Sequence, residues 1–177
     1  GGAQVGICYG RVASNLLPPQ TVVSVLQSNS INTVRIFKPD PEILSSFSGT
    51  GINLIVGVPN EILPELAQNP LSFSSQWLQD NIFAYIPPHK IKYLAVGNEI
   101  FLKEPYFTPF LVPSIKNLHR ALISLNLGDS VKLSSTNAAC VLSCSFPPSN
   151  GTFNLEILPE MKKLLRFLHK TDSPFMV

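Results

Sequence analysis

The chain has 177 residues, of which 45% are apolar and only 14% are charged, and this composition excludes an intrinsically disordered protein. Its formal net charge of +2 is too small to indicate a nucleic-acid-binding protein. The apolar runs, such as residues 52–58, fall far short of the roughly 20 residues that a membrane-spanning helix needs. The sequence therefore predicts one globular domain, or one domain and a piece of another, without a transmembrane segment.

Short β-branched runs alternate with helical patterns along the whole chain. The runs predict strands at residues 5–9, 33–37, 53–58, 93–96 and 131–135, with a sixth strand beginning at 175–177. The helical patterns between them predict helices at residues 18–26, 41–47, 61–67, 73–85, 108–125 and 155–168. This alternation is typical of a parallel sheet with helical crossovers.

Two architectures fit such a pattern, namely an open doubly wound sheet and a closed (β/α)₈ barrel. The first strand is not followed by a Gly-x-Gly-x-x-Gly motif, and the chain has no Gly-x₄-Gly-Lys-Ser/Thr loop, which weakens the case for a nucleotide-binding open sheet. In a barrel, the residues that follow the strands share one rim, where active sites lie. Polar residues follow the predicted strands in this way at Tyr9, Asp40, Asn60, Glu61, Asn98, Glu99 and Asn137.

The number of βα units is smaller than a barrel requires. A complete barrel takes about 250 residues, whereas this chain provides five units and the first residues of a sixth strand. We therefore expect a TIM (β/α)₈ barrel truncated after about five and a half units. Residues 1–177 would be the N-terminal part of that single domain, with no second domain in the chain.

The segment Val96-Gly97-Asn98-Glu99 is the most specific candidate site. Its glutamate stands at the mouth end of a buried strand, where partly apolar surroundings favour the protonated carboxyl that a general acid needs. Asn98 is suited to hydrogen-bond a substrate hydroxyl. A structural role is equally open, because Glu99 could cap the next helix or pair with Lys103.

The cysteines predict neither a disulfide framework nor a metal site. Cys8, Cys140 and Cys144 are an odd set without a Cys-x-x-Cys motif or a histidine cluster, and no cofactor is expected. Cys8 lies in an apolar run typical of a buried thiol, and Cys140 and Cys144 could pair if a turn joins them.

Asn150 begins an Asn-Gly-Thr sequon, a candidate for N-glycosylation in a secreted protein. A chain that starts at a strand, without a signal peptide, is what a processed protein would show.

Five motifs stand in an order that resembles the plant β-1,3-glucanases of glycoside hydrolase family 17. They are Gly-Ile-Cys-Tyr-Gly at 6–10, Val-Arg-Ile-Phe at 34–37, Val-Gly-Val-Pro-Asn-Glu at 56–61, Ile-Lys-Tyr-Leu-Ala-Val-Gly-Asn-Glu at 91–99 and Ser-Phe-Pro-Pro-Ser at 145–149. The resemblance implies a (β/α)₈ barrel and retaining endo-hydrolysis of β-1,3-glucans such as callose or fungal wall glucan. It also implies secretion to the cell wall or apoplast, or delivery to the vacuole.

The resemblance also suggests roles for individual residues. Glu99 resembles the acid/base, Asn98 the neighbour that contacts the 2-hydroxyl of the sugar beside the cleaved bond, and Tyr9 the tyrosine that lines this subsite. Asn60 is a further candidate for substrate binding. Phe37 is another, because aromatic rings suit the faces of pyranose rings. For both Tyr9 and Phe37, packing at the rim is the alternative role.

Two departures from the family pattern affect this expectation. After the second strand, where the family often has tyrosine and then an acidic residue, this chain has Phe37-Lys38-Pro39-Asp40. The family nucleophile lies in a later Ser-Glu-Ser-Gly-Trp-Pro segment, which this sequence does not contain. Retaining hydrolysis needs two carboxyl groups about 5–5.5 Å apart. Glu61 is not expected to be the second of these groups, because it is better placed to stabilise the start of a helix. The nucleophile is therefore expected beyond Val177, and Trp77 is expected to pack in a helix.

Two other classes of protein remain open from the sequence. The chain could be a glucan-binding or defence-related protein that keeps the sugar groove without hydrolysis. It could also be a storage or allergen-like structural protein with no role on glycans. Turnover of laminarin separates the first interpretation from these two.

Overall fold

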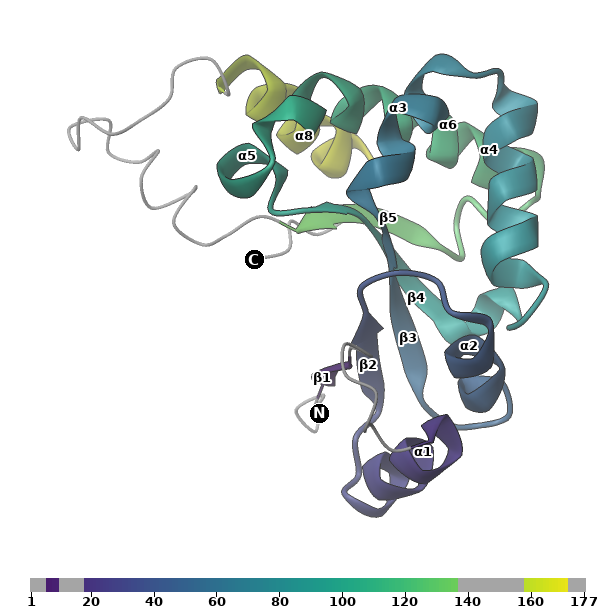
Figure 1. Cartoon of the computed structure of the whole chain (residues 1–177). Helices are drawn as coiled ribbons and strands as arrows, with labels where there is room; N and C mark the ends of the chain where they lie inside the picture. The colour runs from purple at the N-terminus through teal and green to yellow at the C-terminus, as the bar shows by residue number, and fades with distance from the viewer. Residues whose placement is uncertain (1–5, 10–17, 137–157, 172–177) are drawn as a thin grey trace.

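The computed structural model describes residues 6–9, 18–136 and 158–171, which form one parallel sheet with helices beside it (Figure 1). The strands are β1 (Gly6–Tyr9), β2 (Thr33–Ile36), β3 (Asn53–Val58), β4 (Ile91–Asn98) and β5 (Lys132–Thr136). Their order in the sheet is β1-β2-β3-β4-β5, so each strand pairs with the next one along the chain. A doubly wound sheet would reverse its strand order at a switch point, and no reversal occurs among these five strands.

The helices follow the strands along the chain, close to the ranges that the sequence predicts. They are α1 (Pro19–Ser28), α2 (Pro41–Phe47), α3 (Leu63–Gln68), α4 (Leu71–Leu78), α5 (Ile100–Lys103), α6 (Thr108–Ser124) and α8 (Leu158–Lys170). Short 3₁₀ turns are η1 (Asn60–Ile62), η3 (Pro88–Lys90) and η4 (Pro105–Phe107), and η2 (Gln79–Phe83) is a π-helical turn that follows α4. Among the described helices, none is both long and apolar enough to cross a membrane.

One face of the sheet is packed against these helices. Crossovers that always advance in the same direction place their helices on the same face, and Figure 1 shows the helices following one another around one side of the curved sheet. The core on this side contains Val34, Leu54 and Leu94 from the strands with Phe47 and Leu118 from the helices, all fully buried. Successive strand residues point to opposite faces, so the other face carries the alternate set. This is the arrangement of consecutive units in a (β/α)₈ barrel, and the predicted fold class is confirmed.

The structure differs from the predicted elements in two details. The helical stretch predicted at 73–85 changes its winding, because α4 ends at Leu78 and the chain continues as the π-helical turn η2 to Phe83. Helix α5 was not predicted, since four residues are too few to show a helical period. The sixth strand at 175–177, the pair Cys140 and Cys144, and the sequon at Asn150 lie outside the described residues.

Gly57 on β3 allows the backbone that follows β2 to pass close to it. A Cβ atom at this position would lie 2.1 Å from the carbonyl oxygen of Phe37 and 2.6 Å from its carbonyl carbon. We expect Gly57→Ala to lower the free energy of unfolding by about 1–3 kcal/mol, because the backbone at Phe37 must move. Urea unfolding measures the effect. Gly49→Ala is the matched control, since a Cβ there meets nothing within 4 Å. An equal loss in both variants would contradict the packing explanation.

Candidate functional site

The candidate site lies where β4 ends and the chain turns into α5. Two residues at this turn have a positive φ, Gly97 at 74° and Glu99 at 48°. The second is unusual, because left-handed backbone is uncommon for residues other than glycine. Such conformations persist where the surrounding structure holds them, and they gather at functional sites. The turn therefore fixes the direction in which Glu99 leaves the strand.

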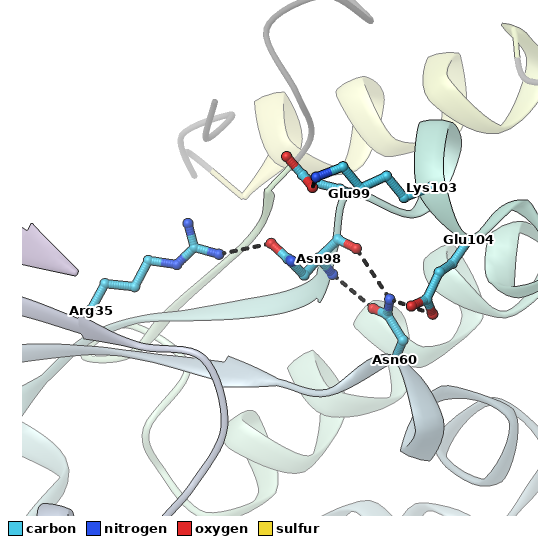
Figure 2. A network of polar contacts seen from close by, with 6 residues as sticks. All are labelled: Arg35, Asn60, Asn98, Glu99, Lys103 and Glu104. Atoms are coloured by element: carbon cyan, nitrogen blue, oxygen red, sulfur yellow. Dashed lines mark hydrogen bonds and ion pairs between the residues drawn. The ribbon is translucent and has the colours of Figure 1, made fainter. Parts of the chain in front are cut away.

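Asn60 holds the backbone of Asn98 from both sides. Its Oδ1 accepts a hydrogen bond from the Asn98 N–H at 2.7 Å, and its Nδ2 donates to the Asn98 carbonyl oxygen at 3.1 Å. The same Nδ2 donates to Oε2 of Glu104 at 3.0 Å. Figure 2 shows the amide of Asn60 between Asn98 and Glu104. Because Asn60 is only 7% exposed, this side chain acts as a buried clamp on the end of β4.

The exposed side chain of Asn98 is oriented by a residue from β2. Nη2 of Arg35 donates to Oδ1 of Asn98 at 3.2 Å, across the intervening strand β3 (Figure 2). The guanidinium carbon of Arg35 also lies 4.9 Å from the ring centroid of Phe37, within the range of a cation–π contact. Phe37 itself is 46% exposed. Arg35 thus connects Phe37 with Asn98, two residues that the sequence proposes as substrate contacts.

Sequence reasoning did not identify Arg35, although a signal for it was present. Val34 and Ile36 on either side are buried against the helices. Period-two alternation places the residue between them on the opposite face. A cation on that face of an otherwise apolar strand marks a residue with a specific partner.

Glu99 forms an ion pair with Lys103. The Nζ atom of Lys103 lies 2.5 Å from Oε2 of Glu99, and the two side chains are 70% and 28% exposed, respectively. Glu99 directly precedes α5, but its side chain makes no capping hydrogen bond to that helix. Of the two structural roles considered for Glu99, the pairing with Lys103 is therefore observed and the capping is not.

The other carboxylates and the tryptophan have structural positions. Asp40 caps α2, because its Oδ1 accepts a hydrogen bond from the Ile43 N–H at 3.1 Å. Glu61 is exposed in the first turn of η1, where a carboxylate is favoured. Trp77 is half-buried against the core, which confirms its predicted packing role. Tyr9 ends β1 with its backbone paired to Ile36, so it joins the same end of the sheet.

The groups at this end of the sheet fit a neutral, hydroxyl-rich ligand. A carboxyl group, an amide and a guanidinium provide hydrogen bonds, and the exposed ring of Phe37 provides an apolar face. Among the described residues, no three His, Cys, Asp or Glu side chains come together as a metal ion would require.

Comparison with known proteins agrees with this geometry. The model of the family "Glycosyl hydrolases family 17" matches residues 5–177. Glucan endo-1,3-beta-glucosidase 7 of Arabidopsis thaliana is 38% identical over 98% of this chain and 34% of its own length. Lichenase-2 of Hordeum vulgare is 38% identical over 97% of this chain and 53% of its own length.

Solved structures give the same result. CJP38, a beta-1,3-glucanase and allergen of Cryptomeria japonica pollen, superposes with a TM-score of 0.87 at 38% identity. The match covers 98% of this chain and 54% of that protein. A plant beta-glucan endohydrolase superposes with a TM-score of 0.84 at 37% identity, over 54% of its own chain. The sequence thus spans between about a third and just over half of the length of these four proteins.

Proposed function

This chain belongs to the glycosyl hydrolases of family 17, and from that membership we propose that it carries the acid/base side of a retaining β-1,3-glucan endo-hydrolase. The observation that supports this most directly is the position of Glu99. It follows the end of β4, next to an Asn98 whose backbone and side chain are both held in place. Callose and fungal wall glucan are the substrates that we propose.

In this mechanism, Glu99 protonates the glycosidic oxygen as the bond breaks and then activates the water that releases the product. The second carboxylate, which attacks the sugar, would lie in a segment following Val177, so that residues 1–177 form the N-terminal part of one barrel domain. The ion pair with Lys103 would open when the glucan binds. Because Lys103 is 70% exposed, its side chain can leave Glu99 without disturbing the core.

The neighbours of Glu99 would position the substrate. Arg35 fixes the side-chain oxygen of Asn98, which gives this amide a defined orientation toward the 2-hydroxyl of the sugar. Phe37 and Tyr9 would provide ring surfaces for pyranose units. The burial of Asn60 supports a role that differs from the direct substrate contact expected from the sequence. We propose that Asn60 is a positioning residue that acts through Asn98.

We further propose that the protein works outside the cytoplasm, in the cell wall, the apoplast or the vacuole. Membership of the family and the sequon at Asn150 support this location. Detection of a glycan on Asn150 by mass spectrometry of the source protein would establish passage through the secretory pathway.

Laminarin turnover by the intact source polypeptide tests the proposed function. We expect short β-1,3-oligosaccharides whose new reducing ends first appear in the β configuration, as NMR of the early products would show. Dextran, an α-glucan, is the control substrate and should remain intact. Laminarin binding without turnover would instead indicate a non-hydrolytic glucan-binding protein. Absence of both binding and turnover would reject any role on this glucan.

A further inference from the structure

A basic groove runs between α6 and α8, and none of the residues of the Glu99 site lines it. Its central hollow has a volume of about 440 Å³. Five cations line this hollow, namely Lys116 and Arg120 from α6 and Lys163, Arg166 and Lys170 from α8. Residues three, four and seven apart share one side of a helix, so each helix presents a row of cations to the groove.

Two further hollows extend the groove along α6. One of about 390 Å³ shares Lys116, Arg120 and Lys163 with the central hollow and reaches Pro109. The other, of about 440 Å³, shares His119 and reaches Ile123 and Asp129. At 1.5 Å per helical residue, the stretch of α6 from 109 to 123 is about 20 Å long. The groove is therefore suited to an extended ligand rather than to a compact ion.

The charge on these two helices differs from that of the rest of the chain. Helices α6 and α8 together contain six lysines and arginines and a single acid, Glu160, which pairs with Lys163 at 3.1 Å. The other 147 residues contain seven lysines and arginines and ten acids. Stabilisation of the helix dipole explains a cation in the last turn of α8, such as Lys170, but not those in the middle of both helices. The net charge of the chain is therefore small, although α6 and α8 together carry a concentrated positive charge.

The groove also contains groups suited to uncharged parts of a ligand. His119 from α6 packs edge-on against Phe167 from α8, with ring centroids 5.5 Å apart. Partial burial, together with the positive charges of Lys132 and Lys170, lowers the pKa of His119 below its usual 6.5. The neutral imidazole that results both donates and accepts hydrogen bonds, as a sugar hydroxyl requires.

We propose that this groove binds an acidic polysaccharide, whose carboxylate or sulfate groups pair with the cations on both walls. The planar guanidinium group of arginine and the ammonium group of lysine both form charge-assisted hydrogen bonds with such oxyanions. A nucleic acid fits less well, because single-strand binding relies on aromatic platforms for the bases. Among the described residues that line the three hollows, Phe167 is the one Phe, Tyr or Trp, and it is half-buried. A flat bilayer would not fill a concave groove. This binding is independent of glucan hydrolysis.

Calorimetry with a galacturonate decamer and a heparin decasaccharide at 50 mM NaCl tests the proposal and distinguishes carboxylate from sulfate recognition. We expect one of them to bind, and we expect the affinity to fall at 200 mM NaCl because salt screens the charges. The double variant Lys163→Gln with Arg166→Gln should bind at least tenfold more weakly, as should Arg120→Gln with Lys116→Gln on the other wall. Lys162→Gln is the matched control, because Lys162 is exposed on α8 but does not line the groove.

Several outcomes would overturn this proposal. They are no binding of either oligosaccharide, an equal loss of affinity in Lys162→Gln, or tighter binding of a single-stranded DNA of equal charge. Tighter binding to vesicles of phosphatidylcholine and phosphatidylserine at 80:20 would also overturn it. Laminarin turnover should be unchanged in every groove variant, so a failure of this inference is distinguishable from a failure of the proposed glucanase activity.

Discussion

Replacing Glu99 with glutamine should lower the kcat for laminarin of the intact source polypeptide by about 10²–10⁴-fold. Glutamine keeps the size of the side chain and much of its hydrogen bonding, but it has no acidic proton to give to the leaving oxygen. Binding of laminarin should therefore be largely retained, because the loss concerns the transition state. Initial rates of reducing-end release measure kcat, and calorimetry with the inactive variant measures glucan affinity.

The substrate gives a second test of the role of Glu99. An aryl β-glucan oligosaccharide with a good leaving group needs little protonation of that group. In Glu99→Gln, the rate at which its glycosidic bond is cleaved should therefore fall much less than the rate for laminarin. Glu61→Gln is the matched control, because Glu61 is also a glutamate at the end of a strand but is exposed on η1. Unchanged laminarin turnover in Glu99→Gln, or an equal loss in Glu61→Gln, would contradict the assignment.

The sequence predicts the strands and the longer helices of this fold well, for a physical reason. Strands β2, β3 and β4 bury apolar residues on the helix side, as at Val34, Leu54 and Leu94. Helix α6 shows a helical period that places Leu111, Ile115 and Leu118 in the core. Local patterns of this kind record the burial of one face. They do not record how a helix is wound, so the pattern at 73–85 indicates a helical stretch but not the π winding that follows α4.

The candidate site is predictable only in part. Glu99 and Asn98 stand out because they follow an apolar strand. Their partners depend on the sheet, since Arg35 reaches Asn98 over 63 positions of sequence and Asn60 reaches it over 38. The register of β2, β3 and β4 brings these residues together, and no local pattern encodes that distance. For the same reason, the positive φ of Glu99 could not be foreseen from its residue type.

The clamp formed by Asn60 should matter for both stability and activity. Asn60→Leu keeps the volume of a nearly buried side chain but removes three hydrogen bonds, at 2.7 Å and 3.1 Å to Asn98 and 3.0 Å to Glu104. Loss of partners for buried polar groups costs about 1–3 kcal/mol per group. We expect the free energy of unfolding to fall by about 2–4 kcal/mol, as measured by urea unfolding. Asn69→Leu is the matched control, because Asn69 is exposed and its Nδ2 donates to the backbone carbonyl oxygen of Glu65, four residues earlier.

The same substitution should reduce laminarin turnover, because Asn98 and Glu99 leave their positions at the end of β4. A shift of about 1 Å in a catalytic group can lower a rate by about 10²-fold.

Exchanging the hydrogen-bonding groups of Asn60 and Glu104 tests whether the hydrogen bonds of Asn60 cause the loss of stability and activity. Asn60→Asp alone places two carboxylates in contact, whereas Asn60→Asp with Glu104→Gln restores an amide–carboxylate pair in the opposite sense. The double variant should therefore be more stable and more active than Asn60→Asp. If Asn60→Leu behaves like Asn69→Leu, or if the Glu104→Gln change rescues nothing, then Asn60 does not position the catalytic turn.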